Sequence, residues 1–233
     1  MNPNDHGKKV SGLFDNIAGW YDFLNHALSA GLDLYWRYRL VRYVRPGATG
    51  LVLDLAAGTL DVSREIRRQN PRLQVLALDF SLPMLCRGKS KISAIPSILP
   101  TQADGRALPL PDNCVDTVTI AFGIRNILPR DDAYREILRV LTPGGRLCIL
   151  EFGTGKARIW QGLYNYYLGV VLPRIGRFFS KNPEAYQYLA DTIRAFPDAR
   201  TLAEELLNAG FTRIDYTALS SGIVYIHVAD KAR

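Results

Sequence analysis

From residue 51 onward, short apolar runs alternate with longer stretches in which apolar residues recur at helical spacing. Five runs have the length of buried strands, and they cover residues 51–56, 73–79, 97–104, 115–122 and 146–152. Residues 60–69 and 131–141 have the helical pattern, and Ser81 is suited to cap a helix after the second run. Strands that alternate with helices predict a parallel sheet with helices on both faces.

Two segments flank or interrupt this alternation. Residues 8–45 carry apolar residues at helical spacing and end at Pro46-Gly47, so we expect residues 1–46 to form a helical cover. Residues 153–197 break the rhythm of strands and helices. We expect them to form an inserted helical segment that covers the substrate at the ligand edge of the sheet.

The chain closes on one helix and two strands. Residues 201–209 have the helical pattern and Gly210 follows as a stop signal. Residues 211–218 and 223–229 are strand-like and lie close together around a Ser-Ser-Gly turn, which predicts an antiparallel pair. Residues 1–233 are therefore expected to form one domain.

The net charge of +7 and the pI of about 9.4 favour anionic partners, although a mildly basic enzyme is equally consistent with them. Basic residues cluster among aromatic ones in two places, at Arg37, Arg39, Arg42 and Arg45, and at Arg174, Arg177 and Lys181. This pattern suits a membrane surface at least as well as a nucleic-acid groove. We expect no nucleic-acid partner and a peripheral membrane contact as one alternative.

Neither membrane spans nor disulfides are predicted. The most apolar long window, 159–179, contains Pro173, Arg174 and Arg177, so it falls short of a spanning helix. Cys86, Cys114 and Cys148 are widely spaced, and the latter two sit in apolar runs as buried thiols would. The N-terminus lacks the apolar core of a signal peptide. We expect a cytoplasmic protein, either free or at the inner face of the membrane, with no bound metal.

The first candidate site is the segment VLDLAAGT, residues 52–59, where a strand enters a glycine turn and a helix. Gly58 permits close backbone approach, and a helix N-terminus favours an anion. A dinucleotide site would need further glycines for the pyrophosphate, and here there is one. S-adenosylmethionine (SAM) has no pyrophosphate and needs less room. An ordinary strand–helix turn is the alternative.

Acidic residues follow the next two strands. Asp79 lies 21 residues after Gly58, a spacing that places a carboxylate on the ribose hydroxyls of a nucleotide. Capping of the helix after Ser81 is its alternative role. Asp104 would end the third strand, where an acceptor can read the adenine amine. The segment FGIRN, 122–126, would place Arg125 and Asn126 at the same edge of the sheet, although such loops are often only solvated turns.

With these motifs in place, the chain resembles the UbiE/MenG family of ubiquinone and menaquinone biosynthesis C-methyltransferases, from about residue 10 to residue 231. The segments most specific to that family are WYDFLN, FGIRN, YQYL and RAFPD, and the matching LDLAAGT and PGG segments are shared by many methyltransferases. The resemblance implies a Rossmann-like class I methyltransferase fold, with a mostly parallel seven-stranded sheet and an antiparallel last strand. It also implies methyl transfer from SAM to a ring carbon of a demethylated polyprenyl quinol, with S-adenosylhomocysteine as the product.

The resemblance and the motifs together assign the candidate site residues. We assign SAM binding to Asp54, Ala56, Gly58, Thr59, Asp79, Phe80, Asp104, Gly105 and Ala121. The family often has Ser at Ala121, so that contact is expected through the backbone only. We assign catalysis to Arg125, Asn126, Tyr21 and Asp22, and substrate binding to Tyr186 and Tyr188. Arg125 is expected to stabilise an oxyanion or orient a water, because a guanidinium stays protonated. Plain packing is the alternative role of the tyrosines, and Asp22 is the candidate base.

Two positions depart from the family pattern. The family usually reads Gly-Thr-Gly-Asp, and this chain has Leu60 at the second glycine. If that position has a positive φ, a leucine costs about 1 kcal/mol or more, and we expect its side chain to crowd the methionine tail of SAM. Arg106 replaces a residue that is commonly Glu. Three alternatives stay open: methylation of another small aromatic or lipid, a catalytically impaired SAM-binding homologue, and a homodimer.

Overall fold

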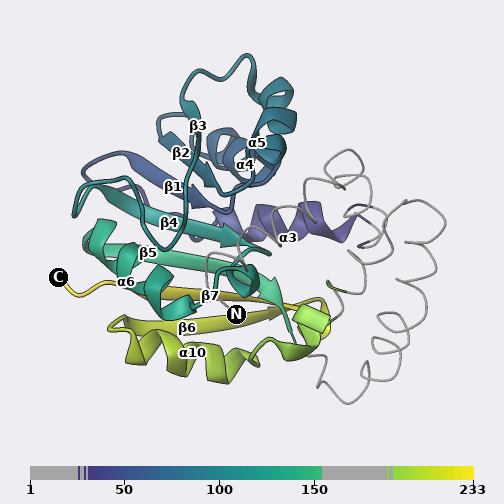
Figure 1. Cartoon of the computed structure of the whole chain (residues 1–233), viewed down its shortest axis with the longest axis vertical. Helices are drawn as coiled ribbons and strands as arrows, with labels where there is room; N and C mark the ends of the chain where they lie inside the picture. The colour runs from purple at the N-terminus through teal and green to yellow at the C-terminus, as the bar shows by residue number, and fades with distance from the viewer. Residues whose placement is uncertain (1–25, 27–28, 30, 154–187, 189–190) are drawn as a thin grey trace.

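The computed structural model describes residues 26, 29, 31–153, 188 and 191–233. Their centre is a seven-stranded sheet with the order β3-β2-β1-β4-β5-β7-β6 (Figure 1). Its strands are β1 Leu51–Leu55, β2 Gln74–Asp79, β3 Ile98–Gln102, β4 Val115–Ala121, β5 Leu141–Phe152, β6 Thr212–Leu219 and β7 Val224–Asp230. The β7 strand is antiparallel to both β5 and β6, and the other neighbouring pairs are parallel. The predicted sheet, including the antiparallel last strand, is confirmed.

Helices cover both faces of the sheet (Figure 1). The described helices are α3 Leu32–Val41, α4 Asp61–Gln69, α5 Leu82–Gly88, α6 Arg130–Val140 and α10 Ala199–Asn208, with short 3₁₀ turns η1 Lys89–Ile92, η2 Ile124–Asn126 and η4 Ser220–Gly222. Two of these helices begin at capped ends, since Ser81 accepts a hydrogen bond from Met84 N at 3.3 Å and Asp198 accepts one from Thr201 N at 2.9 Å.

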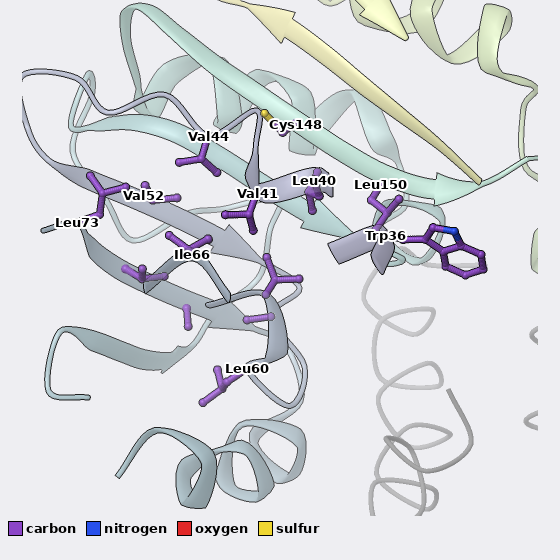
Figure 2. Close-up of a cluster of buried hydrophobic side chains, with 14 of the residues drawn as sticks. Trp36, Leu40, Val41, Val44, Val52, Leu60, Ile66, Leu73, Cys148 and Leu150 are labelled. Carbon is purple, nitrogen blue, oxygen red and sulfur yellow. The ribbon is translucent and has the colours of Figure 1, made fainter. Parts of the chain in front are cut away.

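Successive residues of the central strands belong to two different hydrophobic cores, because side chains alternate between the faces of a sheet. On β1, Val52 packs in one core with residues of α3 and α4, including Leu40 and Ile66 (Figure 2). Its neighbour Leu53 packs in the other, with residues of α6 and α10. The central strands β1 and β4 are thus buried on both faces. They run parallel, so the loops that follow them lie at the same edge of the sheet.

Residues 142–145, which lie between the predicted helix and the predicted fifth strand, belong to β5. The helix ends at Val140 and β5 begins at once at Leu141. In the register with β4, Leu141 pairs with Val115 and Arg146 pairs with Thr117. The extra residues on β5 form a bulge, so Pro143, Gly144 and Gly145 interrupt the ladder inside one strand.

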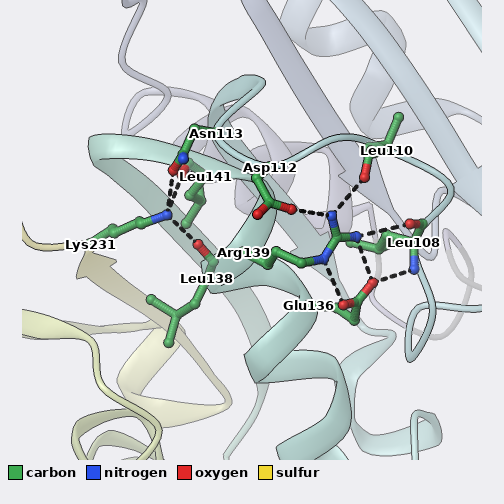
Figure 3. Close-up of polar contacts among 9 residues, drawn as sticks. All are labelled: Leu108, Leu110, Asp112, Asn113, Glu136, Leu138, Arg139, Leu141 and Lys231. Atoms are coloured by element: carbon green, nitrogen blue, oxygen red, sulfur yellow. Dashed lines mark hydrogen bonds and ion pairs between the residues drawn. The ribbon is translucent and has the colours of Figure 1, made fainter.

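Residues 107–113 are held by Arg139 of α6 and by Lys231, which directly follows β7 (Figure 3). Arg139 donates hydrogen bonds to the carbonyls of Leu108 and Leu110 and pairs with Asp112 at 2.8 Å. The Lys231 ammonium donates to Asn113 Oδ1 at 2.7 Å. Arg139 and Lys231 therefore fix the loop between β3 and β4 in place.

The arginine cluster predicted near α3 is only partly a surface feature. Arg37 is buried and forms an ion pair with Asp33, one turn earlier on the same helix. Arg42 remains exposed and donates to the Tyr38 hydroxyl at 3.3 Å. Within the described part of the chain, no helix has both the length and the apolar composition needed to cross a membrane.

Candidate functional site

The turn after β1 has an unusual backbone. Ala56, Gly58 and Leu60 all have positive φ, at 56°, 52° and 68°, before α4 begins at Asp61. Gly58 N donates a hydrogen bond of 2.7 Å to Asp79 Oδ2, and Ser81 N donates one of 2.8 Å to Asp79 Oδ1. One carboxylate therefore joins the end of β2 to the glycine turn of β1. The two sequence motifs form one structural unit; Ser81 caps α5, and Asp79 holds the backbone of that capping residue.

Leu60 adopts the left-handed backbone that the departure from glycine made a concern. Its side chain is fully buried in the core between α4 and α5. A Cβ placed on Gly88 would lie 2.7 Å from Leu60 Cγ, so the glycine of α5 provides the space that the leucine occupies. The packing of Leu60 in this core favours a structural role for its side chain, and its effect on the methionine tail of SAM stays a prediction.

Asp54, which we assigned to SAM binding, is held by hydroxyl groups from two neighbouring elements. Its carboxylate is buried and accepts hydrogen bonds from Ser63 Oγ at 2.6 Å and Thr119 Oγ1 at 3.0 Å. Burial raises the pKa of Asp54 to about 6, although both hydroxyls oppose the rise. Asp54 thus ties β1 to α4 and β4, and its assignment to SAM binding stays a prediction.

The loop after β3 lies beside the end of β1. A Cβ on the buried Gly105 would be 3.2 Å from Ile127 Cδ1 and 3.4 Å from Leu55 Cδ1. Both oxygens of Asp104 accept hydrogen bonds from the Arg106 guanidinium, with the Nη2–Oδ2 distance at 2.7 Å. These bonds hold the pKa of the Asp104 carboxyl below its usual range, against a smaller opposing effect of burial. The Arg106 substitution therefore gives Asp104 a fixed cationic partner.

The FGIRN loop touches the glycine turn directly. A Cβ on Gly123 would lie 2.4 Å from Ala56 Cβ, so only glycine fits at this contact. The loop starts with Phe122 at a φ of 57° and continues as η2. The turn of β1 and the loop that carries Arg125 are thus adjacent, as expected for parallel strands whose carboxyl ends meet at one edge.

Arg125, which we assigned to catalysis at the ligand edge, is buried and paired with a carboxylate that we did not predict. Its Nη1 donates to Glu151 Oε1 at 2.6 Å and to the Phe122 carbonyl at 2.6 Å, and its guanidinium lies 5.5 Å from the centroid of the Phe152 ring. Arg125 is 6% exposed and Glu151 is 1% exposed. Burial raises the pKa of Glu151, and the positive charge of Arg125 opposes that rise.

Glu151 is the site residue that the sequence analysis missed. It lies in the apolar run RLCILEF, which we interpreted as a buried strand without chemistry. The signal available was a single acidic residue near the carboxyl end of that strand, because charged residues are rarely buried without a partner.

Tyr188 and Asn126 lie together, as their shared assignment to the site requires. The Tyr188 hydroxyl donates to Asn126 Oδ1 at 3.2 Å. Burial raises the pKa of Tyr188, and Arg125 opposes the rise. Tyr21, Asp22 and Tyr186 lie outside the described residues. Phe80 is exposed and Ala121 half-buried, both at the strand ends, and Thr59 is buried.

Three aromatic rings pack together, and one of them, Phe152, lies against the Arg125 guanidinium. The ring centroids of Phe122 and Phe152 are 4.7 Å apart, and Trp36 lies 6.2 Å from Phe122. Within the described ranges, no group of three His, Cys, Asp or Glu side chains is arranged to hold a metal ion. The three cysteines are free, with Cys148 buried as predicted and Cys114 half-buried.

Comparison with known proteins agrees with this architecture. A structure of a SAM-dependent methyltransferase from Thermotoga maritima superposes with a TM-score of 0.68 at 13% identity, covering 95% of this chain and 99% of that one. A Geobacter sulfurreducens protein named ubiquinone/menaquinone biosynthesis C-methyltransferase UbiE is 40% identical over 97% of this chain and 90% of its own length. A Shewanella oneidensis protein of the same name is 38% identical over 94% of this chain and 88% of its own.

The ubiE/COQ5 methyltransferase family matches residues 3–231. The structural likeness establishes the class I methyltransferase fold, and the family match extends over nearly the whole sequence. The chain belongs to the ubiE/COQ5 methyltransferase family.

Proposed function

We propose that this protein transfers a methyl group from SAM to a ring carbon of a demethylated polyprenyl quinol in quinone biosynthesis. Relatives named ubiquinone/menaquinone biosynthesis C-methyltransferase align with nearly the whole chain. The observation on which the proposal rests is the unit formed by Asp79 and the turn at Gly58, which lies against the loop of Arg125.

The residues at the strand ends fit SAM. A carboxylate oxygen can accept more than one hydrogen bond, so Asp79 can hold the turn and bind the two ribose hydroxyls. Gly58, Thr59 and the N-terminus of α4 would face the methionine carboxylate. Phe80, Asp104, Gly105 and Ala121 would surround the adenine. When bound, SAM supplies an electrophilic methyl group on a positively charged sulfur.

The chain's own residues would prepare the nucleophile. Carbon methylation needs electron density on the ring carbon, and a quinol supplies it as its hydroxyl loses a proton. Arg125 would stabilise the developing phenolate, because its buried positive charge acts in a medium of low dielectric constant. Asn126 and Tyr188, joined by a hydrogen bond, would orient the ring beside Arg125.

A peripheral membrane contact would give access to a lipid-soluble substrate. The outer face of α3 exposes Leu34, Tyr35 and Tyr38, with side chains 59%, 44% and 36% exposed, next to Arg42. Aromatic and basic residues on one helix face are typical of binding to the headgroup region of an anionic bilayer.

The direct test is turnover with defined acceptors. We expect methylation of a demethylmenaquinol with a short prenyl tail, and little methylation of simple phenols under the same anaerobic conditions. Mass spectrometry of the product would show a mass increase of one methylene on the ring. Equal activity on unrelated phenols would assign another aromatic substrate. SAM binding without methylation of any quinol would identify a non-catalytic homologue.

A further inference from the structure

The Arg125–Glu151 ion pair is only half satisfied. Glu151 Oε2 and Arg125 Nε are both buried, and neither atom has a hydrogen-bond partner among the residues that the structure describes. The atoms that do bond are Nη1 and Oε1, at 2.6 Å. One ion pair therefore holds one unused acceptor and one unused donor beneath the surface.

A purely structural role explains this arrangement poorly. Burying two charges costs several kcal/mol per ion, and an apolar pair of similar volume is often as stable or more stable. The remaining unpaired polar atoms add to that cost, because each gives up its hydrogen bond to water. Buried polar atoms without partners are uncommon in native proteins and indicate a functional role or a missing ligand.

The location of the pair indicates the function. Arg125 follows β4 and Glu151 lies next to the last residue of β5, so both side chains are at the carboxyl edge of the sheet where SAM is proposed to bind. Gly123, two residues before Arg125, contacts Ala56 of the glycine turn. A hydroxyl group can donate one hydrogen bond and accept another, so its bonding capacity matches the unused acceptor Glu151 Oε2 and the unused donor Arg125 Nε.

We propose that Glu151 is the proton acceptor of the methyl transfer, taking the hydroxyl proton of the quinol on Oε2 while Arg125 stabilises the phenolate oxygen. This inference rests on the proposed function. It assigns to Glu151 the base that we first sought in Asp22.

The O–H bond of the quinol breaks and its proton goes to Glu151. The ring carbon forms a bond to the methyl group as the S–CH₃ bond breaks, and the electron pair of that bond stays on sulfur. The resulting dienone loses its ring hydrogen as a proton to water, which restores the aromatic ring. Glu151 then returns its proton to the ring oxygen, so the net release is one proton.

The surroundings suit a carboxylate that gains and loses a proton. Burial raises the pKa of Glu151 towards the working pH, where a general base is most effective. The charged or titratable side chains placed beside Glu151 within the described residues are Arg125 from η2, its ion-pair partner, and Tyr225, its register partner on β7. Tyr188 lies beside the loop residue Asn126, to which its hydroxyl donates. Arg125 is the only cation among them, and it keeps the ionised form available.

The decisive variant is Glu151→Gln, which keeps the size of the side chain and an oxygen for Arg125 Nη1. We expect kcat on the quinol to fall by about 10²- to 10⁴-fold. SAM affinity by calorimetry should stay within about threefold, which also reports folding. Glu205→Gln, which alters an arginine-paired glutamate on α10, is the matched control and should keep kcat near that of the wild type.

The pH profile separates proton acceptance from positioning of Arg125. The wild type should lose activity as acid protonates Glu151, Glu151→Asp should keep this acidic limb at lower kcat, and Glu151→Gln should lack it. A readout without turnover is carboxyl ¹³C NMR of glutamate-labelled protein. One resonance should titrate above the usual glutamate range and be missing in Glu151→Gln.

The outcomes distinguish two failures. A wild type that methylates no quinol would refute the proposed function, and with it any proton acceptor for that reaction. A wild type that is active, with Glu151→Gln equally active and its acidic limb unchanged, would refute the role of Glu151 alone. If Glu151→Gln fails to bind SAM, a pH profile of the wild type that is flat on the acid side, or the absence of the shifted glutamate resonance, would overturn the proposal.

Discussion

At the scale of single residues, spacing along the sequence predicted which backbone positions lie together. It did not predict which side chains contact one another. The 21-residue interval between Gly58 and Asp79 correctly indicated that the two lie together, since both positions are set by the ends of neighbouring parallel strands. The roles of Asp54 and Leu60 could not be predicted, because each depends on side chains that other elements bring to it. Ser63 and Thr119 occupy the Asp54 carboxylate, and Gly88 makes room for Leu60.

Replacing Leu60 tests whether it supports the core or hinders SAM. We expect Leu60→Gly to lower the free energy of unfolding by about 2–4 kcal/mol, because the cavity costs more than the relief of the left-handed backbone returns. Urea unfolding measures the loss, and Leu85→Ala in the same core should show a similar one. SAM affinity should not improve; a tenfold tighter complex would mean that the leucine does crowd the cofactor.

Asp54 should leave a signature in the pH dependence of stability. Its folded pKa of about 6 lies above the ordinary value of 3.8, so the folded protein holds this proton more tightly than the unfolded chain does. Stability is therefore expected to fall as pH rises from about 4 to about 6, by on the order of 2–3 kcal/mol from this group. Asp54→Asn should flatten that part of the curve. Urea midpoints measured at several pH values test this. If the midpoint of Asp54→Asn depends on pH as steeply as that of the wild type, Asp54 does not cause the effect.

At the scale of elements, the alternation of apolar runs predicted every strand of the sheet, and the errors lie where backbone geometry overrides local pattern. The Pro-Gly-Gly segment looks like a turn in sequence, but pairing with β4 makes it a bulge within β5. Glu151 escaped notice for a related reason: its apolar neighbours predict a strand, and only the loop after β4 supplies the arginine that makes it functional.

The contact between the FGIRN loop and the glycine turn can be tested by adding and removing one methyl group. Gly123→Ala should push the loop away from Ala56, because the new Cβ would lie 2.4 Å from the existing one. We expect kcat to fall by at least about tenfold, as displacement of reacting groups by about 1 Å can cost a factor of 10². The double variant with Ala56→Gly removes the clash and suits the positive φ of that position, so it should recover most of the activity. No recovery would show that the contact does not position Arg125.

At the scale of the whole molecule, the fold brings the loops after β1, β3 and β4 and the buried Arg125–Glu151 pair to one edge of the sheet. The fold class, the order of its elements and the position of the ligand edge followed from the pattern of the sequence and from the resemblance to a family. The net charge did not identify a partner, because it does not show which arginines are available at the surface. Arg37 is buried in an ion pair, and other arginines pair with nearby carboxylates.

The exposed face of α3 predicts binding to anionic membranes. Vesicles of phosphatidylethanolamine and phosphatidylglycerol should co-sediment with the protein more strongly than neutral phosphatidylcholine vesicles, and added salt should weaken the binding. The double substitution Leu34→Ser and Arg42→Glu should reduce it several-fold, whereas Arg200→Glu on α10, whose side chain is also exposed, should have a smaller effect. Equal binding of both vesicle types by all variants would contradict a role for this face.

The central claim is that Asp79, held by the turn at Gly58, binds the ribose of SAM. Calorimetric titration of S-adenosylhomocysteine into the wild type and into Asp79→Ala tests it most directly, with circular dichroism to verify folding. The loss of charge-assisted hydrogen bonds worth about 1.5–3 kcal/mol each should weaken binding by at least about tenfold. A folded Asp79→Ala variant that binds as tightly as the wild type would contradict the account.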